Sequence, residues 1–217
     1  MEQYPSKKNE IVISKVLNLI HEYDMFSKCD NVLVGLSGGS DSMCMLDVLY
    51  KLKDELEIKL IVAHVNHLIR GVESDEDEKF VRNYCAEKNL PFYSTKVDAI
   101  KYSKKEKLSL EDAARILRYS YLKEVSIDKN AIIAVAHHMD DQAETILQNF
   151  MRGSGTSGLS GMSPVNKNII RPLLNCSKQE INDYIDVHKI PFRIDRTNLD
   201  LNALRNRLRH RLFPELR

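Results

Sequence analysis

The sequence has no uninterrupted apolar stretch long enough to cross a membrane, and its opening residues, MEQYPSKKNE, are too polar for a secretory signal. Cysteine is sparse: Cys29, Cys44, Cys85 and Cys176 are scattered, and no two of them form a C-x-x-C pair. This spacing argues against both a disulfide framework and a thiolate metal or iron–sulfur site. We therefore expect a soluble, cytoplasmic chain without membrane association, whose thiols are buried or incidental.

A strong net charge is also missing, because 32 Lys and Arg residues stand against 31 Asp and Glu residues. The overall composition therefore does not indicate a polyanionic partner. The C-terminal part differs, since residues 188–217 hold eight basic residues against three acidic ones. The basic members are Lys189, Arg193, Arg196, Arg205, Arg207, Arg209, Arg211 and Arg217. Such a patch suits phosphate backbones.

A chain of 217 residues with 43% hydrophobic residues can bury one substantial core as a single domain. Short apolar runs predict strands at residues 31–37, 58–65, 91–98, 131–137 and 169–174. Longer amphipathic segments predict helices at residues 10–26, 41–55, 73–88, 110–125, 140–151 and 178–188. Ser109 with Asp112, and Ser177 with Glu180, resemble capping boxes at the start of two of these helices.

Strands that are apolar throughout and joined by helices imply a parallel sheet covered on both faces. We expect an α/β fold, a doubly wound parallel sheet of about five strands with helices on both faces. Ligands of such sheets bind at the carboxyl ends of the strands, where the strand order reverses. Polar residues gather after three of the predicted strands, at residues 37–42, 63–70 and 137–144.

The turn after the first predicted strand reads SGGSDS, residues 37–42. Exposed backbone N–H groups at a helix start favour phosphate. The turn is not a Walker A loop, because that loop requires a lysine, and it does not fit G-x-G-x-x-G either. A carboxylate beside phosphates, here Asp41, is tolerable chiefly when a cation such as Mg²⁺ lies between them. The plain alternative is a turn that merely connects a strand to a helix.

His137 ends the fourth predicted strand, and Asp141 and Glu144 lie one turn apart on the next helix. Together these groups are suited to hold an ammonium and to take its proton. Asp140 and Asp141 alternatively favour a helix N-terminus, as acids do. His138 is left as a packed or exposed side chain.

Two further groups leave alternatives open. His64 and His67 offer imidazoles to zinc, but no cysteine or closed ligand set accompanies them. Arg115 and Arg118 lie three apart on one predicted helix. For them, contact with phosphate or RNA and a solvated face, on which Glu111 pairs with Arg115, are equally supported.

The C-terminal residues 196–217 predict a basic helix with one apolar stripe, formed by Leu201, Leu204, Leu208 and Leu212. Arginines flank the stripe on both sides, with Arg205 and Arg209 on one edge and Arg207 and Arg211 on the other.

SGGSDS resembles the pyrophosphatase loop of the N-type ATPases, which cleave ATP between the α- and β-phosphates and adenylate a substrate. Further motifs follow in order: AHVNHLIRG at residues 63–71, AHHMDDQAET at 136–145, RGSGTSGLSGM at 152–162, IRPLL at 170–174 and DRTNLDLNALRNRLRHRLFPEL at 195–216. Together they resemble the tRNA(Ile)-lysidine synthetase family over nearly the whole chain from Asn31 onward.

The resemblance implies an adenine nucleotide alpha hydrolase-like fold for residues 1–195, with residues 196–217 starting a linker to further domains. It implies a ligase that uses ATP and Mg²⁺ to adenylate C2 of the wobble cytidine of tRNA(Ile) with a CAU anticodon. Free L-lysine then displaces AMP, and the product is lysidine. A homodimer stays open as the assembly.

The resemblance also implies roles for individual residues. The residues expected to bind ATP are Ser37, Gly38, Gly39, Ser40, Asp41, Ser42, Ala63 and His64. Those expected to act in catalysis are Asp41, which also holds Mg²⁺, His137, Asp141, Glu144 and Arg205. Those expected to contact tRNA are Arg70, Arg205, Arg207, Arg209 and Arg211.

Two other functions stay open. A tRNA-thiolating relative would share the ATP loop, but relatives that rely on cysteine chemistry or a cluster generally carry paired cysteines, which this sequence lacks. A non-catalytic domain that binds ATP or AMP would share the fold. The presence of SGGSDS together with AHHMDDQAET argues against it.

Overall fold

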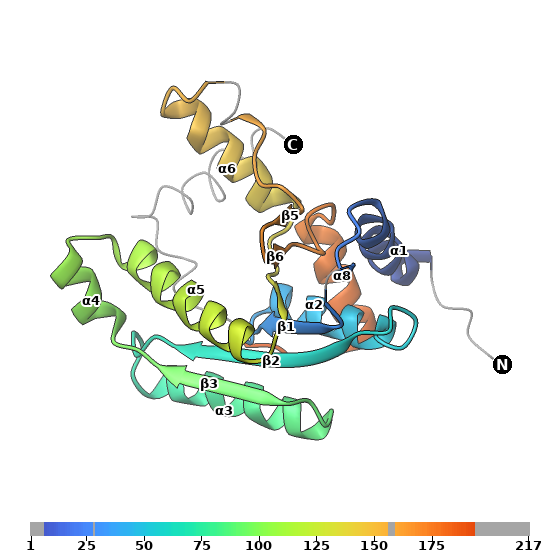
Figure 1. The fold of residues 1–217 in the computed structure, drawn as a ribbon, viewed down its shortest axis with the longest axis horizontal. Coiled ribbons are helices and arrows are strands. Elements are labelled where there is room, and N and C mark those ends of the chain that lie inside the picture. Colours follow the sequence, from blue (N-terminus) through green and yellow to red (C-terminus); the bar gives the residue numbers. More distant parts are fainter. Residues whose placement is uncertain (1–6, 28, 156–158, 194–217) are drawn as a thin grey trace.

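The computed structural model describes residues 7–27, 29–155 and 159–193. Within these ranges six strands form one sheet in the order β3-β2-β1-β4-β6-β5 (Figure 1). Neighbouring strands are parallel except for β5 and β6, which are antiparallel. The strands are β1 (Asn31–Gly35), β2 (Lys59–Asn66), β3 (Phe92–Lys96), β4 (Ile132–Ala134), β5 (Val165–Asn166) and β6 (Ile169–Ile170).

The helices of the described ranges are α1 (Lys7–Glu22), α2 (Ser40–Leu52), α3 (Val72–Glu87), α4 (Ala99–Glu106), α5 (Leu110–Asp128), α6 (Met139–Met151) and α8 (Lys178–His188). Of these, α4 was not predicted, because it is short, rich in lysine and buries little besides Ala99. Asp98 starts it by accepting a hydrogen bond from the Lys101 N–H at 2.8 Å. In the part of the chain that the structure describes, no helix is apolar over the length a bilayer requires.

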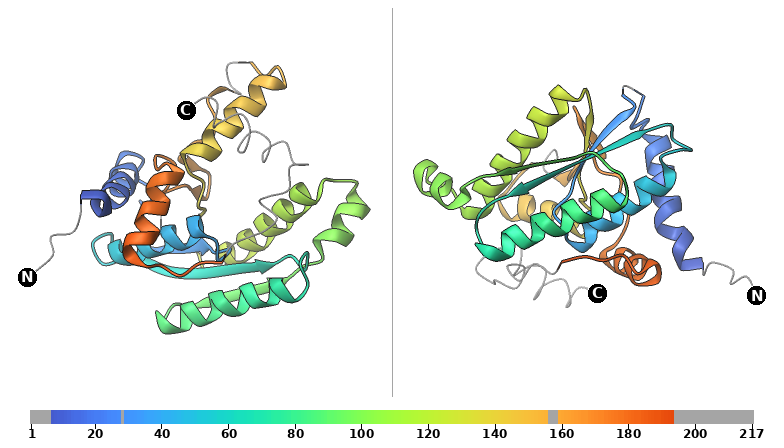
Figure 2. Two further views of the ribbon diagram at one scale, coloured as in Figure 1. Left: turned by 180° about the vertical axis from the view of Figure 1, so that it is seen from behind. Right: turned by 90° about the horizontal axis from the view of Figure 1, so that it is seen from below.

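Helices cover both faces of the sheet (Figure 2). Along β1, Val32 and Val34 join a core with residues of α1, α2, α3 and α8, whereas Leu33 packs on the opposite face with residues of α5. All three side chains are fully buried, as expected for a central strand of a parallel sheet. The predicted class, an α/β fold with a doubly wound, parallel-dominated sheet, is confirmed.

The sheet contains a reversal of strand order beside β1. From β1 the chain passes to β2 and β3 on one side, and then returns to β4 on the other side. In sheets of this kind the crevice at the carboxyl ends of the strands, at the point of reversal, binds the ligand. The residues after β1, β2 and β4 are therefore placed where a site is expected.

The far edge of the sheet differs from the prediction. The strand expected at residues 169–174 ends at Ile170, because Pro172 has no N–H to donate and the chain turns. The N–H groups of Leu174 and Cys176 donate to the carbonyls of Arg171 and Leu173, at 3.1 and 2.8 Å. The antiparallel pairing of β5 with β6 was also not predicted.

Candidate active site

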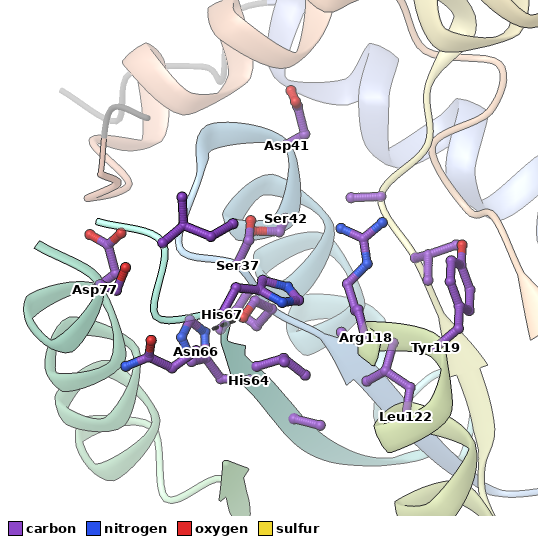
Figure 3. Close-up of a pocket in the computed structure, with 18 of the residues that line it drawn as sticks. Ser37, Asp41, Ser42, His64, Asn66, His67, Asp77, Arg118, Tyr119 and Leu122 are labelled. Carbon is purple, nitrogen blue, oxygen red and sulfur yellow. Dashed lines mark hydrogen bonds between the residues drawn. The ribbon is translucent and has the colours of Figure 1, made fainter. Parts of the chain in front are cut away.

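A cavity of about 330 Å³ opens at the carboxyl ends of β1 and β2, beside the residues that follow β4 (Figure 3). Segments that are far apart in the sequence form its wall. The lining includes Ser37, Asp41, Ser42, Ala63, His64, His67, Arg70, Asp77, Arg118, Tyr119, Leu122 and His137. Its volume lies within the range of small-molecule sites.

The glycine turn between β1 and α2 has a backbone that only glycine adopts easily. Gly38 has a φ of +90°, and a Cβ on it would lie 3.3 Å from Val81 Cγ2. Within the turn, Ser42 Oγ donates to the Gly39 carbonyl at 3.0 Å and lies 3.1 Å from Ser37 Oγ. Both hydroxyls are therefore held in place at the cavity wall.

The N-terminal ends of α2, α6 and α8 lie side by side at the glycine turn. Capping boxes occupy two of them, His138 with Asp141 on α6 and Ser177 with Glu180 on α8. At the start of α2, whose N-cap is Gly39, no side chain accepts a capping hydrogen bond. The first N–H groups of α2 therefore suit an anion.

His138 joins the glycine turn to the acid-bearing helix. Its Nε2 lies 3.7 Å from a carboxylate oxygen of Asp41 and 3.4 Å from one of Asp141. Nδ1 accepts the Asp140 N–H at 3.3 Å, so the neutral ring carries its proton on Nε2, between the two carboxylates. No catalytic role was predicted for this residue. Its position before two acids at a strand-to-helix junction was the available signal for a helix cap.

His137 lines the cavity and has a different partner. Arg171 Nε donates to His137 Nδ1 at 3.2 Å, and Arg171 Nη1 donates to the Ser163 carbonyl at 2.6 Å. The neutral His137 ring therefore carries its proton on Nε2, and this nitrogen is a donor rather than a base. Arg171, which is 6% exposed, was not assigned from the sequence, although it lies in the IRPLL motif.

The two predicted acids of α6 lie in different surroundings. Asp141 accepts the His138 N–H at 3.1 Å, so the helix-start role considered for it is present next to the contact with the imidazole. Glu144, one turn later, is fully buried. Asp140 accepts from the Lys178 N–H of α8 at 3.4 Å and thereby links α6 to α8.

His64 within β2 and His67 directly after it are both neutral at neutral pH. Burial lowers the pKa of His64, whose Nδ1 donates to the Leu36 carbonyl at 2.8 Å. Burial, with a smaller effect of Arg118, lowers the pKa of His67 to about 4. Among the described residues, no three or more His, Cys, Asp and Glu side chains are grouped to hold a metal ion, so the zinc alternative gains no support.

The arginines that the sequence left undecided have different positions. Arg118 lines the cavity, as His67 does (Figure 3). Both guanidinium groups lie over the Tyr119 ring, 5.1 Å from its centroid for Arg115 and 5.5 Å for Arg118, but Arg115 is not among the residues that line the cavity. Contact with a ligand is therefore supported for Arg118.

Arg70 lines the cavity with its charge paired. Its Nη2 lies 2.5 Å from Asp77 Oδ2, and Arg193 Nε donates to the other Asp77 oxygen at 2.9 Å. The Arg193 N–H donates to the Gly38 carbonyl at 2.9 Å, which ties this segment to the glycine turn. The tRNA contact of Arg70 stays a prediction. Several predictions lie outside the described residues. They are the domain boundary between residues 195 and 196, the C-terminal helix, and the roles of Arg205, Arg207, Arg209 and Arg211.

A family model described as a PP-loop domain matches residues 8–216. The chain belongs to the PP-loop family, and this membership implies ATP binding. Its sequence is similar to tRNA(Ile)-lysidine synthases. It is 46% identical over 205 residues to that of Clostridium tetani, covering 94% of this chain and 44% of the relative. It is 44% identical over 210 residues to that of Geobacter sulfurreducens, covering 95% and 44%. The chain thus spans less than half the length of these relatives. The resemblance to tRNA(Ile)-lysidine synthetases that the motifs indicated is confirmed.

Solved structures share the fold. A U34-tRNA thiolase from Methanococcus maripaludis, with its 4Fe-4S cluster, has a TM-score of 0.71 at 20% identity, covering 96% of this chain and 78% of that one. An NH3-dependent NAD synthetase from Campylobacter jejuni has a TM-score of 0.57 at 19% identity, covering 94% and 86%. At such low identity these neighbours support the architecture alone.

Proposed function

We propose that this chain carries out the ATP-dependent formation of lysidine on tRNA(Ile) with a CAU anticodon. In the first step the C2 carbonyl oxygen of the wobble cytidine attacks the α-phosphorus of ATP, and pyrophosphate leaves. In the second step the amine of free L-lysine attacks C2, and AMP leaves with the former carbonyl oxygen. The identity with synthases that carry this name supports the proposal.

The closeness of the glycine turn and the acid-bearing helix is the observation that carries this proposal. One imidazole, that of His138, lies 3.7 Å from Asp41 on the turn and 3.4 Å from Asp141 on α6. Phosphates held at the first turn of α2 would therefore lie next to α6. The reaction requires this arrangement, because the wobble cytidine must reach the α-phosphorus of ATP and the lysine amine must then reach C2 of the same cytidine.

The glycine turn would bind the phosphates. Attack on the α-phosphorus builds negative charge on its oxygens and on pyrophosphate, so catalysis depends on positioning and electrostatic stabilisation. The N–H groups of α2 and the hydroxyls of Ser37 and Ser42 are suited to receive these oxygens. They would bind in the same way whichever substrate base is adenylated.

Asp41 would hold Mg²⁺ together with the phosphates. Its carboxylate is 33% exposed, and the described residues include no closed metal site. This fits Mg²⁺, which keeps several waters and is usually bound by one or two carboxylates plus substrate phosphates. The bound ion would neutralise charge on the departing pyrophosphate.

The acids of α6 would bind the amine donor. Free lysine is protonated near neutral pH, and a buried carboxylate such as Glu144 is stabilised by a cationic partner. Asp141 would contact the same ammonium or the cytosine.

His137, which carries its proton on Nε2, would donate to an oxygen of the substrate. The predicted arginines at 70, 205, 207, 209 and 211 would meet the tRNA backbone.

One assay tests the whole proposal. The protein is incubated with ATP, Mg²⁺, radiolabelled lysine and tRNA(Ile) bearing the CAU anticodon, and label in the tRNA is measured. We expect incorporation that requires all four components, and none with a matched tRNA that has uridine at the wobble position. Release of AMP and pyrophosphate with tRNA but without lysine incorporation would point to another group donor.

The thiolase alternative finds little support in the cysteines. Burial raises the pKa of Cys85 and of Cys176 to about 12, and it raises the pKa of Cys44 as well. Since the thiolate is the reactive form, these thiols are inert at neutral pH. None of the described cysteines belongs to a group that could hold a metal ion.

A further inference from the structure

The glycine turn has no lysine of its own, yet a lysine ammonium contacts it from a distant part of the chain. Lys178 Nζ donates to Ser40 Oγ at 2.8 Å and forms an ion pair with Asp41 Oδ1. Lys178 is the first residue of α8, 137 positions after Asp41. The packing of α8 beside α2 thus supplies the cation that a Walker A loop carries in its own sequence.

The pairing of Lys178 with Asp41 is open to exchange. The side chains are 35% and 33% exposed, so solvent screens their attraction and the pair contributes little to stability. An ammonium has three donors, of which Ser40 and Asp41 receive two. A third can meet a phosphate oxygen without any movement of the helix.

We propose that Lys178 is a pyrophosphate-binding residue of this site. Before nucleotide binds, its ammonium neutralises Asp41. With ATP and Mg²⁺ bound, Asp41 would hold the metal ion, and the Lys178 ammonium would contact an oxygen of the departing pyrophosphate. This role rests on the ATP-binding part of the proposed function and is independent of tRNA and lysine.

A purely structural role would require that Lys178 hold α8 in place against α2. Other contacts already hold α8: Tyr184 Oη donates to Asp47 of α2 at 2.7 Å, and Lys15 of α1 lies 2.7 Å from Glu180. The capping box of Ser177 and Glu180 starts the helix. The partly exposed pair of Lys178 and Asp41 is therefore not needed to dock α8.

Binding measurements with the full chain test the proposal. The probes are Mg-pyrophosphate, Mg-ATP and adenosine, and the variants are Lys178→Gln and Lys178→Arg. Lys15→Gln is the matched control, because this lysine is 36% exposed, close to the 35% of Lys178, and pairs with the same helix away from the glycine turn. We expect Lys178→Gln to weaken pyrophosphate and ATP binding at least tenfold, since a hydrogen bond to a charged group contributes about that much. Adenosine binding should not change, and Lys178→Arg should retain most of the affinity.

A double-mutant cycle separates direct contact from an effect through Asp41. If Lys178 binds pyrophosphate itself, Lys178→Gln weakens binding further in an Asp41→Asn background. The proposal is overturned if that double variant matches Asp41→Asn alone, if Lys178→Gln binds pyrophosphate as the wild type does, or if adenosine binding falls equally. Because neither tRNA nor lysine is present, a failed lysidine assay would leave this result unaffected.

Discussion

Gly38 shows how a single backbone angle shapes the turn that we propose binds phosphate. Its φ of +90° is strained for any other residue, and a Cβ there would make a tight contact of 3.3 Å with Val81 Cγ2. We expect Gly38→Ala to lower the free energy of unfolding by about 1 to 2 kcal/mol, the cost of a left-handed backbone for an L-residue. The same change should weaken ATP binding at least about tenfold, because the N–H groups of the turn are displaced.

Denaturant unfolding and ATP titration measure the two effects of Gly38→Ala. Gly155→Ala serves as the control, since a Cβ there would meet nothing within 4 Å. An alanine at residue 38 that leaves ATP affinity at the wild-type value would contradict the role of the turn.

Asp41 allows a second test at one side chain. Asn has the same shape but no charge, so Asp41→Asn should remove most of the Mg²⁺-dependent release of pyrophosphate, about a hundredfold if a metal ligand is lost. Activity is followed as pyrophosphate release at increasing Mg²⁺ concentration. Asp54→Asn, at a side chain that is 87% exposed and paired with Lys53, is the control. If Asp41→Asn released pyrophosphate with the same dependence on Mg²⁺ as the wild type, the role of Asp41 as a metal ligand would be contradicted.

The helix α8 couples local stability to the site. Ser177 caps it by accepting the Glu180 N–H at 3.2 Å, and Lys178 follows directly. We expect Ser177→Ala to lower the free energy of unfolding by about 1 kcal/mol and to weaken pyrophosphate binding, because the first turn that carries Lys178 frays. Calorimetric unfolding and pyrophosphate titration check the two parts.

Ser109 provides the comparison for this cap. It starts α5 by accepting the Asp112 N–H at 3.0 Å, and α5 packs on the opposite face of the sheet. Ser109→Ala should lower stability by a similar amount, about 1 kcal/mol, and leave pyrophosphate binding unchanged. Equal binding in both alanine variants would show that the cap of α8 does not act on the site.

Histidines make the whole molecule sensitive to mild acid. Burial lowers the pKa of His64, His67 and His188 below the ordinary 6.5, to about 4 for His67. Below pH 6.5 the unfolded chain therefore binds protons that the folded chain does not. The free energy of unfolding should fall as the pH is lowered from 6.5 and, for the His67 contribution, level off below about 4.

Urea midpoints between pH 7.5 and about 4.5 measure this loss. His67→Asn should reduce it, whereas the same change at exposed His21 should leave it as in the wild type. A stability that rises toward acid pH in this window would contradict the neutral state of these histidines.

Local patterns predicted much of this protein. The apolar runs located β1, β2, β3 and β4, the Ser177 and Glu180 pair located the start of α8, and SGGSDS located the glycine turn between β1 and α2 with its carboxylate. These features depend on side-chain periodicity and on contacts within a few residues, which the sequence displays directly. Short or charged elements such as α4 and the pairing of β5 with β6 carry no such pattern and were missed.

The sequence by itself determined where most of the strands and helices form, and it supplied the chemical groups of the glycine turn and of the α6 acids. Only the tertiary structure decided that His138 stands between Asp41 and Asp141, that Arg171 sets the tautomer of His137, and that Lys178 reaches the turn. The contacts of Asp41 with His138 and with Lys178, and that of His137 with Arg171, join side chains from different elements, up to 137 positions apart. They form because hydrophobic packing brings the N-terminal ends of α2, α6 and α8 together. No local sequence pattern predicts this arrangement.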